Sequence, residues 1–251
     1  MSALAATSAI SPVFPAWPAA LALAFNLALL VAGVMTPGLA MFAPIVTRFD
    51  GSRRQIALTF DDGPSPTSTP ELLAELARHN ARATFFVLGT KAERHPEILA
   101  AIHAGGHEIG LHGLEHDRLL SFRHPNQIVA QLERAQAIVM ATTGRSARLF
   151  RPPIGHVSPR TAKAARRLGL TLVGWSIRAR DGLASAKAGD VARRVVSRLG
   201  PGAIVLLHDA SERDQYRPAS VAAIVPILAA IAERGLACVT VSEALSADQH
   251  A

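Results

Sequence analysis

Short apolar runs alternate with longer amphipathic stretches from Gln55 to the end of the chain, and this alternation restricts the fold most. Strand–helix alternation is typical of a mainly parallel sheet, either closed as a barrel or open and doubly wound. The apolar runs predict seven strands, at Gln55–Phe60, Ala83–Leu88, Glu108–Leu111, Leu149–Arg151, Thr171–Trp175, Ala203–His208 and Ala237–Val241. The stretches between them predict helices, at Pro70–His79, Pro96–Ala104, Pro125–Thr143, Pro159–Leu168, Asp190–Leu199 and Ala219–Arg234.

Polar residues stand at the C-terminal ends of most of these strands, and this placement favours the barrel. In a barrel of alternating strands and helices, the reactive side chains collect at that one rim. The first strand is not followed by GxGxxG, and the chain has no glycine-rich phosphate loop with a lysine, which argues against a nucleotide-binding sheet.

The rim residues are acids, bases and possible metal ligands. They are Asp61 and Asp62 after the first strand, His112 and His116 after the third, Arg151 at the end of the fourth, Asp181 beyond the fifth, and His208 at the end of the sixth. Two histidines at i and i+4 with one carboxylate can hold a metal ion and leave positions open for water and substrate. Taken alone, the His-x3-His pair is weak, and paired aspartates often only cap a turn. Adjacent buried carboxylates repel unless a cation stabilises them, and a metal together with Arg151 would do so.

The N-terminal part of the chain is apolar and uncharged, with no Asp, Glu, Lys or Arg from Met1 to Thr47. Ala16–Val46 is long enough as a helix to exceed the ~30 Å hydrocarbon core of a bilayer. Pro37-Gly38 divides it, so residues 1–48 predict a membrane segment of either one span or a broken hairpin, ahead of a catalytic domain at 49–251. A buried soluble helix is the weaker alternative, and a cleavable signal peptide fits poorly because the charged start is missing.

The net charge of +7 does not indicate nucleic-acid binding. The basic residues are scattered arginines on helix faces, and aromatic residues make up only 5% of the chain. Arg48, Arg53 and Arg54, which directly follow the apolar segment, favour attraction to anionic lipid or glycan instead. Cys238 is the single cysteine, so disulfides and thiolate metal clusters are excluded.

Four runs of residues resemble the motifs of a known family, the polysaccharide deacetylases of carbohydrate esterase family 4, or NodB homology domain. The most specific is TFDDGP at 59–64. Gly106–Gly110 followed by His-x3-His, RPPIG at 151–155 and LLHD at 206–209 repeat the later motifs in order. The resemblance covers about Gln55 to Val241 and implies a distorted (β/α)7 barrel.

The resemblance also implies a role for each motif residue. Asp62, His112 and His116 are expected to hold one divalent metal ion, usually zinc, with cobalt, manganese or nickel as alternatives. Asp61 is the expected base, His208 the expected acid, and Arg151 and Asp181 orient them. The backbone N–H of Ile154 is the expected oxyanion donor, and Leu206 and Leu207 the expected lining of the acetyl pocket.

The expected reaction is removal of an N-acetyl or similar N-acyl group, formyl included, from an amino sugar in a glycan or lipid-linked saccharide. Gly113, Ile154 and Gly182 depart from the family's usual residues; these changes touch the substrate groove and spare the catalytic set. The rival interpretation is an inactive membrane glycan-binding protein on the same fold.

The resemblance implies a bacterial cytoplasmic membrane location, but the side of the membrane is left open. The positive-inside rule places Arg48, Arg53 and Arg54, and the domain behind them, in the cytoplasm, whereas the family's substrates lie mostly outside.

Overall fold

A computed structural model describes residue 15 and residues 17–248, which divide into two compact units, one ending at Ala32 and one beginning at Gly33. The predicted membrane segment at 1–48 therefore lies partly outside the described residues. Its described part contains α1 (Trp17–Met35), whose side chains are almost all exposed and which is the only described helix long and apolar enough to cross a membrane. A signal sequence would meet the same criteria.

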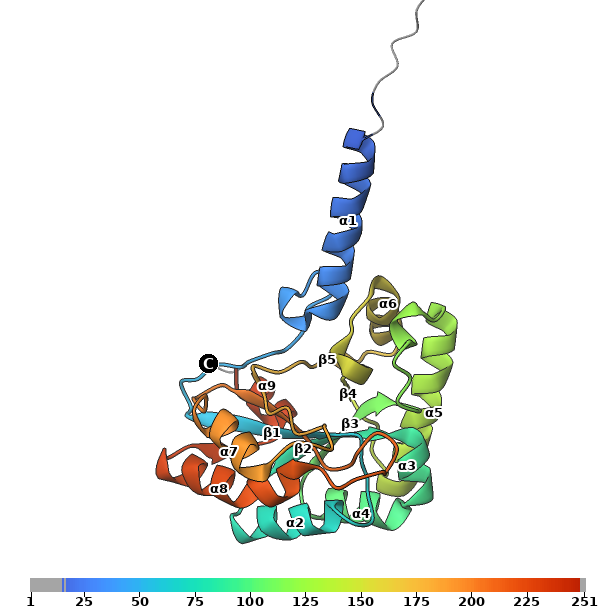
Figure 1. Cartoon of the computed structure of the whole chain (residues 1–251). Coiled ribbons are helices and arrows are strands. Elements are labelled where there is room, and N and C mark those ends of the chain that lie inside the picture. The colour runs from blue at the N-terminus through green and yellow to red at the C-terminus, as the bar shows by residue number, and fades with distance from the viewer. Residues whose placement is uncertain (1–14, 16, 249–251) are drawn as a thin grey trace, which may run out of the picture. The chain divides into compact units, whose positions relative to one another are not determined.

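A curled parallel sheet forms the centre of the larger unit (Figure 1). The paired strands run in the order β5-β4-β3-β2-β1-β7-β6, and β8 pairs with the start of β1. Their bounds are β1 Gln55–Asp61, β2 Ala83–Leu88, β3 Glu108–Gly113, β4 Leu149–Phe150, β5 Thr171–Leu172, β6 Ile177–Arg178, β7 Ile204–His208 and β8 Ala237–Cys238. This confirms the predicted (β/α) barrel type, with one short strand, β6, that the sequence did not predict.

The segment that precedes β1 links β5, at one end of the sheet, to β7, next to the other end. Val46 forms a parallel bridge with Val173, just after β5, and Arg48 forms an antiparallel bridge with Ala203, just before β7. Phe42 and Ile45 also pack against the hydrophobic core. Residues from Phe42 onward are therefore part of the fold around the sheet.

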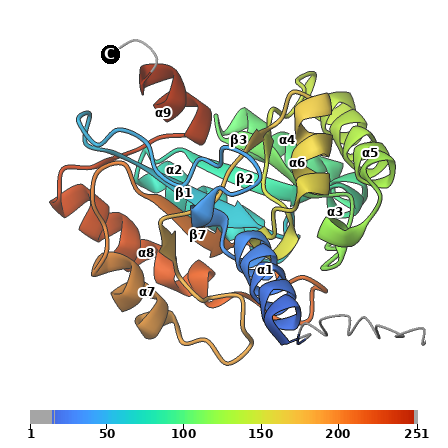
Figure 2. The same ribbon diagram turned by 90° about the horizontal axis from the view of Figure 1, so that it is seen from above.

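The helices pack around the outside of this sheet, with α7 and α8 on one side and α5 and α6 on the other (Figure 2). Their bounds are α2 Thr69–Arg78, α3 Gly89–Arg94, α4 Pro96–Ala104, α5 Pro125–Thr143, α6 Pro159–Arg167, α7 Ala188–Val196, α8 Ala219–Glu233 and α9 Val241–Asp248. Three 3-10 turns, η1 Pro37–Leu39, η2 Leu120–Phe122 and η3 Pro153–Gly155, complete the elements. The predicted strand over Ala237–Val241 is shorter than expected, since α9 already begins at Val241.

Strand β1 is central because it pairs with β2 on one side and β7 on the other. Six of its seven residues are buried, as expected for a parallel strand covered on both faces. The register places Asp61 directly beside His208 at the C-terminal ends of β1 and β7. Two groups nearly 150 positions apart in sequence thus become neighbours at one rim.

Candidate active site

The predicted rim residues line or support one cavity of about 380 Å³ at the C-terminal ends of the strands. Asp61, Asp62, His112, His116, Ile154, Leu206 and His208 line it directly. Arg151 and Asp181 are completely buried behind it. The volume lies at the small end of the ~300–1,000 Å³ typical of small-molecule sites.

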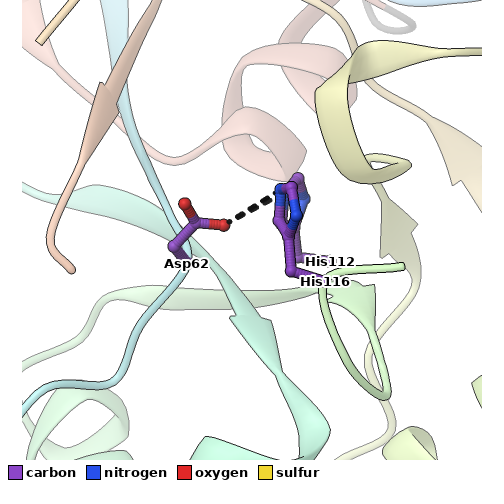
Figure 3. Close-up of side chains that lie close together, drawn as sticks. All are labelled: Asp62, His112 and His116. Atoms are coloured by element: carbon purple, nitrogen blue, oxygen red, sulfur yellow. Dashed lines mark ion pairs between the residues drawn. The ribbon is translucent and has the colours of Figure 1, made fainter. Parts of the chain in front are cut away.

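Asp62, His112 and His116 form a set of three possible metal ligands within the cavity (Figure 3). Asp62 Oδ1 lies 3.4 Å from His112 Nε2 and 3.6 Å from His116 Nε2. This oxygen is buried and makes no hydrogen bond to the described residues. A buried carboxylate oxygen without a donor, aimed at two imidazole nitrogens, fits a cation between the three groups.

The hydrogen bond of His112 sets the orientation of its ring. Its Nδ1 lies 2.7 Å from the carbonyl oxygen of Arg151, which can only accept, so Nδ1 carries the proton. The Nε2 lone pair then faces Asp62 and is free to bind a metal. Burial lowers the pKa of His112, although Asp61 and Asp62 oppose this, and the ring is therefore neutral as a ligand must be.

Glu212 supports the second metal-ligand candidate, and it was not predicted. Its Oε1 lies 3.3 Å from His116 Nδ1, and Arg118 holds its other oxygen from Nε at 3.1 Å. Nδ1 makes no hydrogen bond to the described residues, so the contact is electrostatic, and a carboxylate beside the remote nitrogen of a ligand histidine raises the basicity of the ring. The sequence offered only one indication of this role, which is that Glu212 is an acidic residue four positions after His208.

Arg151 holds Asp61 in place. Its Nη1 donates to Asp61 Oδ1 at 2.7 Å and to Thr59 Oγ1 at 2.8 Å, while Nη2 donates to the carbonyl of Gly174 at 2.8 Å. Its guanidinium also stacks over the Phe86 ring at 4.1 Å. With Oδ1 of Asp61 occupied in this way, its second oxygen is left for the cavity.

Asp181 holds His208 through two contacts. One carboxylate oxygen accepts from the His208 backbone N–H at 2.7 Å, and the other lies 3.0 Å from Nδ1. Burial lowers the pKa of His208, but the Asp181 carboxylate, assisted by Asp62 and Asp61, outweighs burial and raises it to about 9. His208 is therefore protonated at neutral pH, with Nε2–H left as a donor.

Asp62 and Gly63 occupy a crowded turn after β1. Asp62 has φ +75°, a left-handed conformation that is rare outside glycine and occurs preferentially at functional sites. A Cβ on Gly63 would lie 1.9 Å from Asp209 Oδ2. Asp209 in turn accepts from Thr69 Oγ1 at 2.6 Å, and its backbone N–H donates to the Asp61 carbonyl. The turn that presents Asp62 is thus fixed by close packing.

Leu206 lines the cavity, whereas Leu207 does not and packs in the hydrophobic core. The expectation that both leucines line the acetyl pocket is therefore wrong for Leu207. The reason is the period of a strand, since successive side chains point to opposite faces.

A larger hollow, of about 540 Å³, lies at the opposite edge of the sheet and is lined by His103, His107 and Glu108. Its acid is already engaged, because Glu108 Oε2 accepts from Thr84 Oγ1 and from the backbone N–H of Ser242. The smaller rim cavity is the candidate active site because it alone contains the convergent acid, base and ligand groups among the described cavities.

Comparison with known proteins identifies the family. The polysaccharide deacetylase family model matches residues 49–173. A chitooligosaccharide deacetylase of Sinorhizobium fredii is 35% identical over 187 residues, covering 72% of this chain and 86% of that protein. The chain belongs to the polysaccharide deacetylase family.

The relatives and structural neighbours vary in length, and one of them is a pseudoenzyme. The Listeria monocytogenes peptidoglycan-N-acetylglucosamine deacetylase PgdA is 37% identical over 158 residues, covering 63% of this chain but only 33% of PgdA, so the chain spans about a third of that relative. Among solved structures, the Bc1960 peptidoglycan N-acetylglucosamine deacetylase superposes with a TM-score of 0.73 at 29% identity, covering 78% of this chain and 90% of that one. A Bacillus anthracis family 4 pseudoenzyme shares the fold equally well (TM-score 0.73, 23% identity, 80% and 69% covered), so the fold alone does not establish catalysis.

Proposed function

We propose that this chain is a metal-dependent hydrolase that removes an N-acetyl group from an amino sugar in a glycan or lipid-linked saccharide. The observation that carries the proposal is the convergence of the Asp62–His112–His116 set, Asp61 and His208 on one cavity. The named activities of the Sinorhizobium and Listeria relatives, both deacetylases, support it.

Asp61 would act as the general base toward an attacking water. Its Oδ1 is occupied by Arg151, which leaves Oδ2 to accept a proton and fixes the plane of the carboxylate. A divalent ion held by Asp62, His112 and His116 would lower the pKa of a water toward ~7 and stabilise negative charge on the amide oxygen. The backbone N–H of Ile154, at the cavity wall, is the proposed second donor to that oxygen.

His208 would act as the general acid toward the leaving amine. An amine leaves poorly unless it is protonated, and a histidine whose pKa is raised to about 9 holds its proton at neutral pH. Asp181 is the positioning residue that keeps the ring charged and directs Nε2–H to the cavity. Leu206 would provide the apolar wall for the acetyl methyl.

Zinc is the proposed metal, with cobalt, manganese or nickel as alternatives. Two imidazoles and one carboxylate suit zinc and leave open positions for water and substrate. We propose that the apolar segment containing α1 is a membrane anchor and that the rest of the chain is the catalytic domain. The expected boundary at residue 48 lies too far along the chain, because Phe42, Ile45 and Val46 already pack on the sheet. The length and apolar composition of α1 support the anchor.

The rival function is a glycan-binding protein that has lost catalysis, and a pseudoenzyme does occur among the structural neighbours. Every group that the proposed mechanism needs is present here: three ligands, the base with its arginine, and the acid with its aspartate. Retention of the whole set favours the enzyme.

The test is acetate and formate release from soluble chito-oligosaccharides, peptidoglycan fragments and polyprenyl-linked amino sugars, assayed side by side. We expect acetate from at least one substrate with wild-type protein, and at least 100-fold less with His208→Asn, since a general acid contributes about 10²–10⁴-fold. Glycan binding without release of acetate or formate from any substrate would support the rival function.

A further inference from the structure

Two arginines, Arg178 and Arg180, lie on the rim of the catalytic cavity at the end of β6. Arg178 is the register partner of Leu206 in the neighbouring β7. Paired positions of adjacent strands share a face of the sheet, so Arg178 projects to the same side as the cavity-lining Leu206. Ile177 and Ala179, which alternate with the two arginines, are buried in the core. The alternation thus directs the Arg178 guanidinium to the substrate side, and Arg180, which lies beyond the strand, lines the same cavity.

Neither side chain has a hydrogen-bond or ion-pair partner among residues 17–248, and both are exposed. Other arginines near the site are engaged: Arg151 binds Asp61, and Arg118 binds Glu212. A guanidinium carries five donors in a planar fork, so the two rim arginines offer unused donors beside the reacting groups.

The acids that line the cavity do not neutralise these two charges. Asp61 is held by Arg151, Glu212 by Arg118, and Asp62 faces His112 and His116. With a divalent ion in place, the cavity would carry still more positive charge. Unpaired positive charge at the rim of a cleft attracts anionic ligands.

Arg180 is held in an unusual backbone conformation, with φ +58°. Residues other than glycine adopt this region rarely, and they do so preferentially at functional sites. The next residue, Asp181, is fixed by both of its contacts with His208. The direction of Arg180 is therefore tied to the carboxylate that holds the proposed general acid.

We propose that Arg178 and Arg180 form an anion-binding subsite beside the reacting amide, so that the preferred substrate carries a carboxylate or phosphate next to its N-acetyl sugar. The inference rests on the proposed deacetylase function and narrows its substrate class. Planar guanidinium groups bind both oxyanions through paired hydrogen bonds, and the two sources of charge are separated by the substrates below.

The test compares substrates that differ in one anionic group. N-acetylglucosaminyl-N-acetylmuramic acid is set against N,N′-diacetylchitobiose for the carboxylate, and N-acetylglucosamine 1-phosphate against methyl N-acetylglucosaminide for the phosphate. We expect wild-type kcat/KM to be higher for the anionic member of at least one pair. The pair that shows this preference identifies whether the substrate's anionic group is a carboxylate or a phosphate. The preference should shrink as ionic strength rises.

The Arg178→Gln/Arg180→Gln double variant should reduce this anionic-to-neutral ratio about 10- to 100-fold, as expected for loss of charge-assisted hydrogen bonds. The matched control is Arg166→Gln/Arg198→Gln, which removes the same charge from exposed positions outside the cavity and should leave the ratio unchanged. A wild-type ratio near one for both pairs, or a preference that the double variant retains, would overturn the subsite but not the deacetylase function. Acetate release from none of the four substrates or the longer glycans would instead count against the function itself.

Discussion

Arg151 Nη1 donates to Asp61 Oδ1 across 2.7 Å, and both side chains are almost completely buried. The pair joins the end of β1 to the residue that follows β4. Because the carbonyl of Arg151 also accepts from His112 Nδ1, one residue positions both the proposed base and a proposed metal ligand. Arg151 therefore fixes two groups of the site from behind the cavity.

Replacement of Arg151 should destabilise the fold and the site together. Arg151→Met leaves the Asp61 carboxylate buried without its cation, at a cost of about 3–5 kcal/mol. Arg151→Lys keeps the charge but loses the planar fork, and should cost less. Urea unfolding at pH 7 measures both variants, and equal midpoints for wild type and Arg151→Met would contradict the assigned ion pair.

The pH profile of kcat/KM should have an alkaline limb near pH 9, where His208 loses its proton. Asp181→Asn removes the carboxylate that raises this pKa, so the limb should move toward the ordinary value near 6.5. Glu115→Gln, at an exposed position beside the site, is the control and should keep the wild-type limb. An unchanged limb in Asp181→Asn would show that Asp181 does not hold the proton on the acid.

Gly63→Ala should destabilise the protein by about 1–3 kcal/mol, because a Cβ there meets Asp209 Oδ2 at 1.9 Å. The matched control is Gly189→Ala in α7, where a Cβ meets nothing within 4 Å and helix propensity improves. Relative to wild type, the free energy of unfolding should fall in Gly63→Ala and rise in Gly189→Ala. Similar values would argue against close packing at the turn that presents Asp62.

His107 should make the fold sensitive to acid. Burial, assisted by Arg82, lowers its pKa from 6.5 to about 4, and its Nδ1 accepts from the backbone N–H of Ala83 at 3.2 Å. The native state thus favours the neutral ring. Its stabilising contribution is complete above pH 6.5 and is lost as the pH falls through 4, up to about 3 kcal/mol.

His107→Gln should flatten this part of the stability curve, whereas His103→Gln, in the last turn of α4, should not. Urea unfolding at pH 7 and pH 4 measures the difference. An equal loss of stability between these pH values in wild type and His107→Gln would rule out the assigned titration.

The strand ends could be predicted from sequence because buried strands are continuous apolar runs and the rim of a parallel barrel collects polar groups. The adjacency of Asp61 and His208 could not, since strand order depends on tertiary packing and β7 inserts beside β1. Strand β6 has two residues, too few for a periodic pattern of apolar residues to predict it. The contact of Glu212 with His116 could not be predicted either, because Glu212 lies in a loop.

Two features that the sequence predictions missed, the start of α9 and the orientation of Leu207, could have been predicted from sequence patterns. Thr240 and Glu243 cap α9 reciprocally, each side chain accepting from the other's backbone N–H, and the spacing T-x-x-E is the usual capping-box pattern. Strand alternation likewise implies that only one of Leu206 and Leu207 can face the cavity.

The central claim is that Asp62, His112 and His116 hold one metal ion on which deacetylation depends. The most direct measurement is titration of chelator-treated protein with zinc, following bound metal and acetate release from the best substrate together. We expect both to saturate at one ion per chain, and Asp62→Asn to lose both while remaining folded. Full activity in the metal-free protein, or one tightly bound ion retained by Asp62→Asn, would contradict the account.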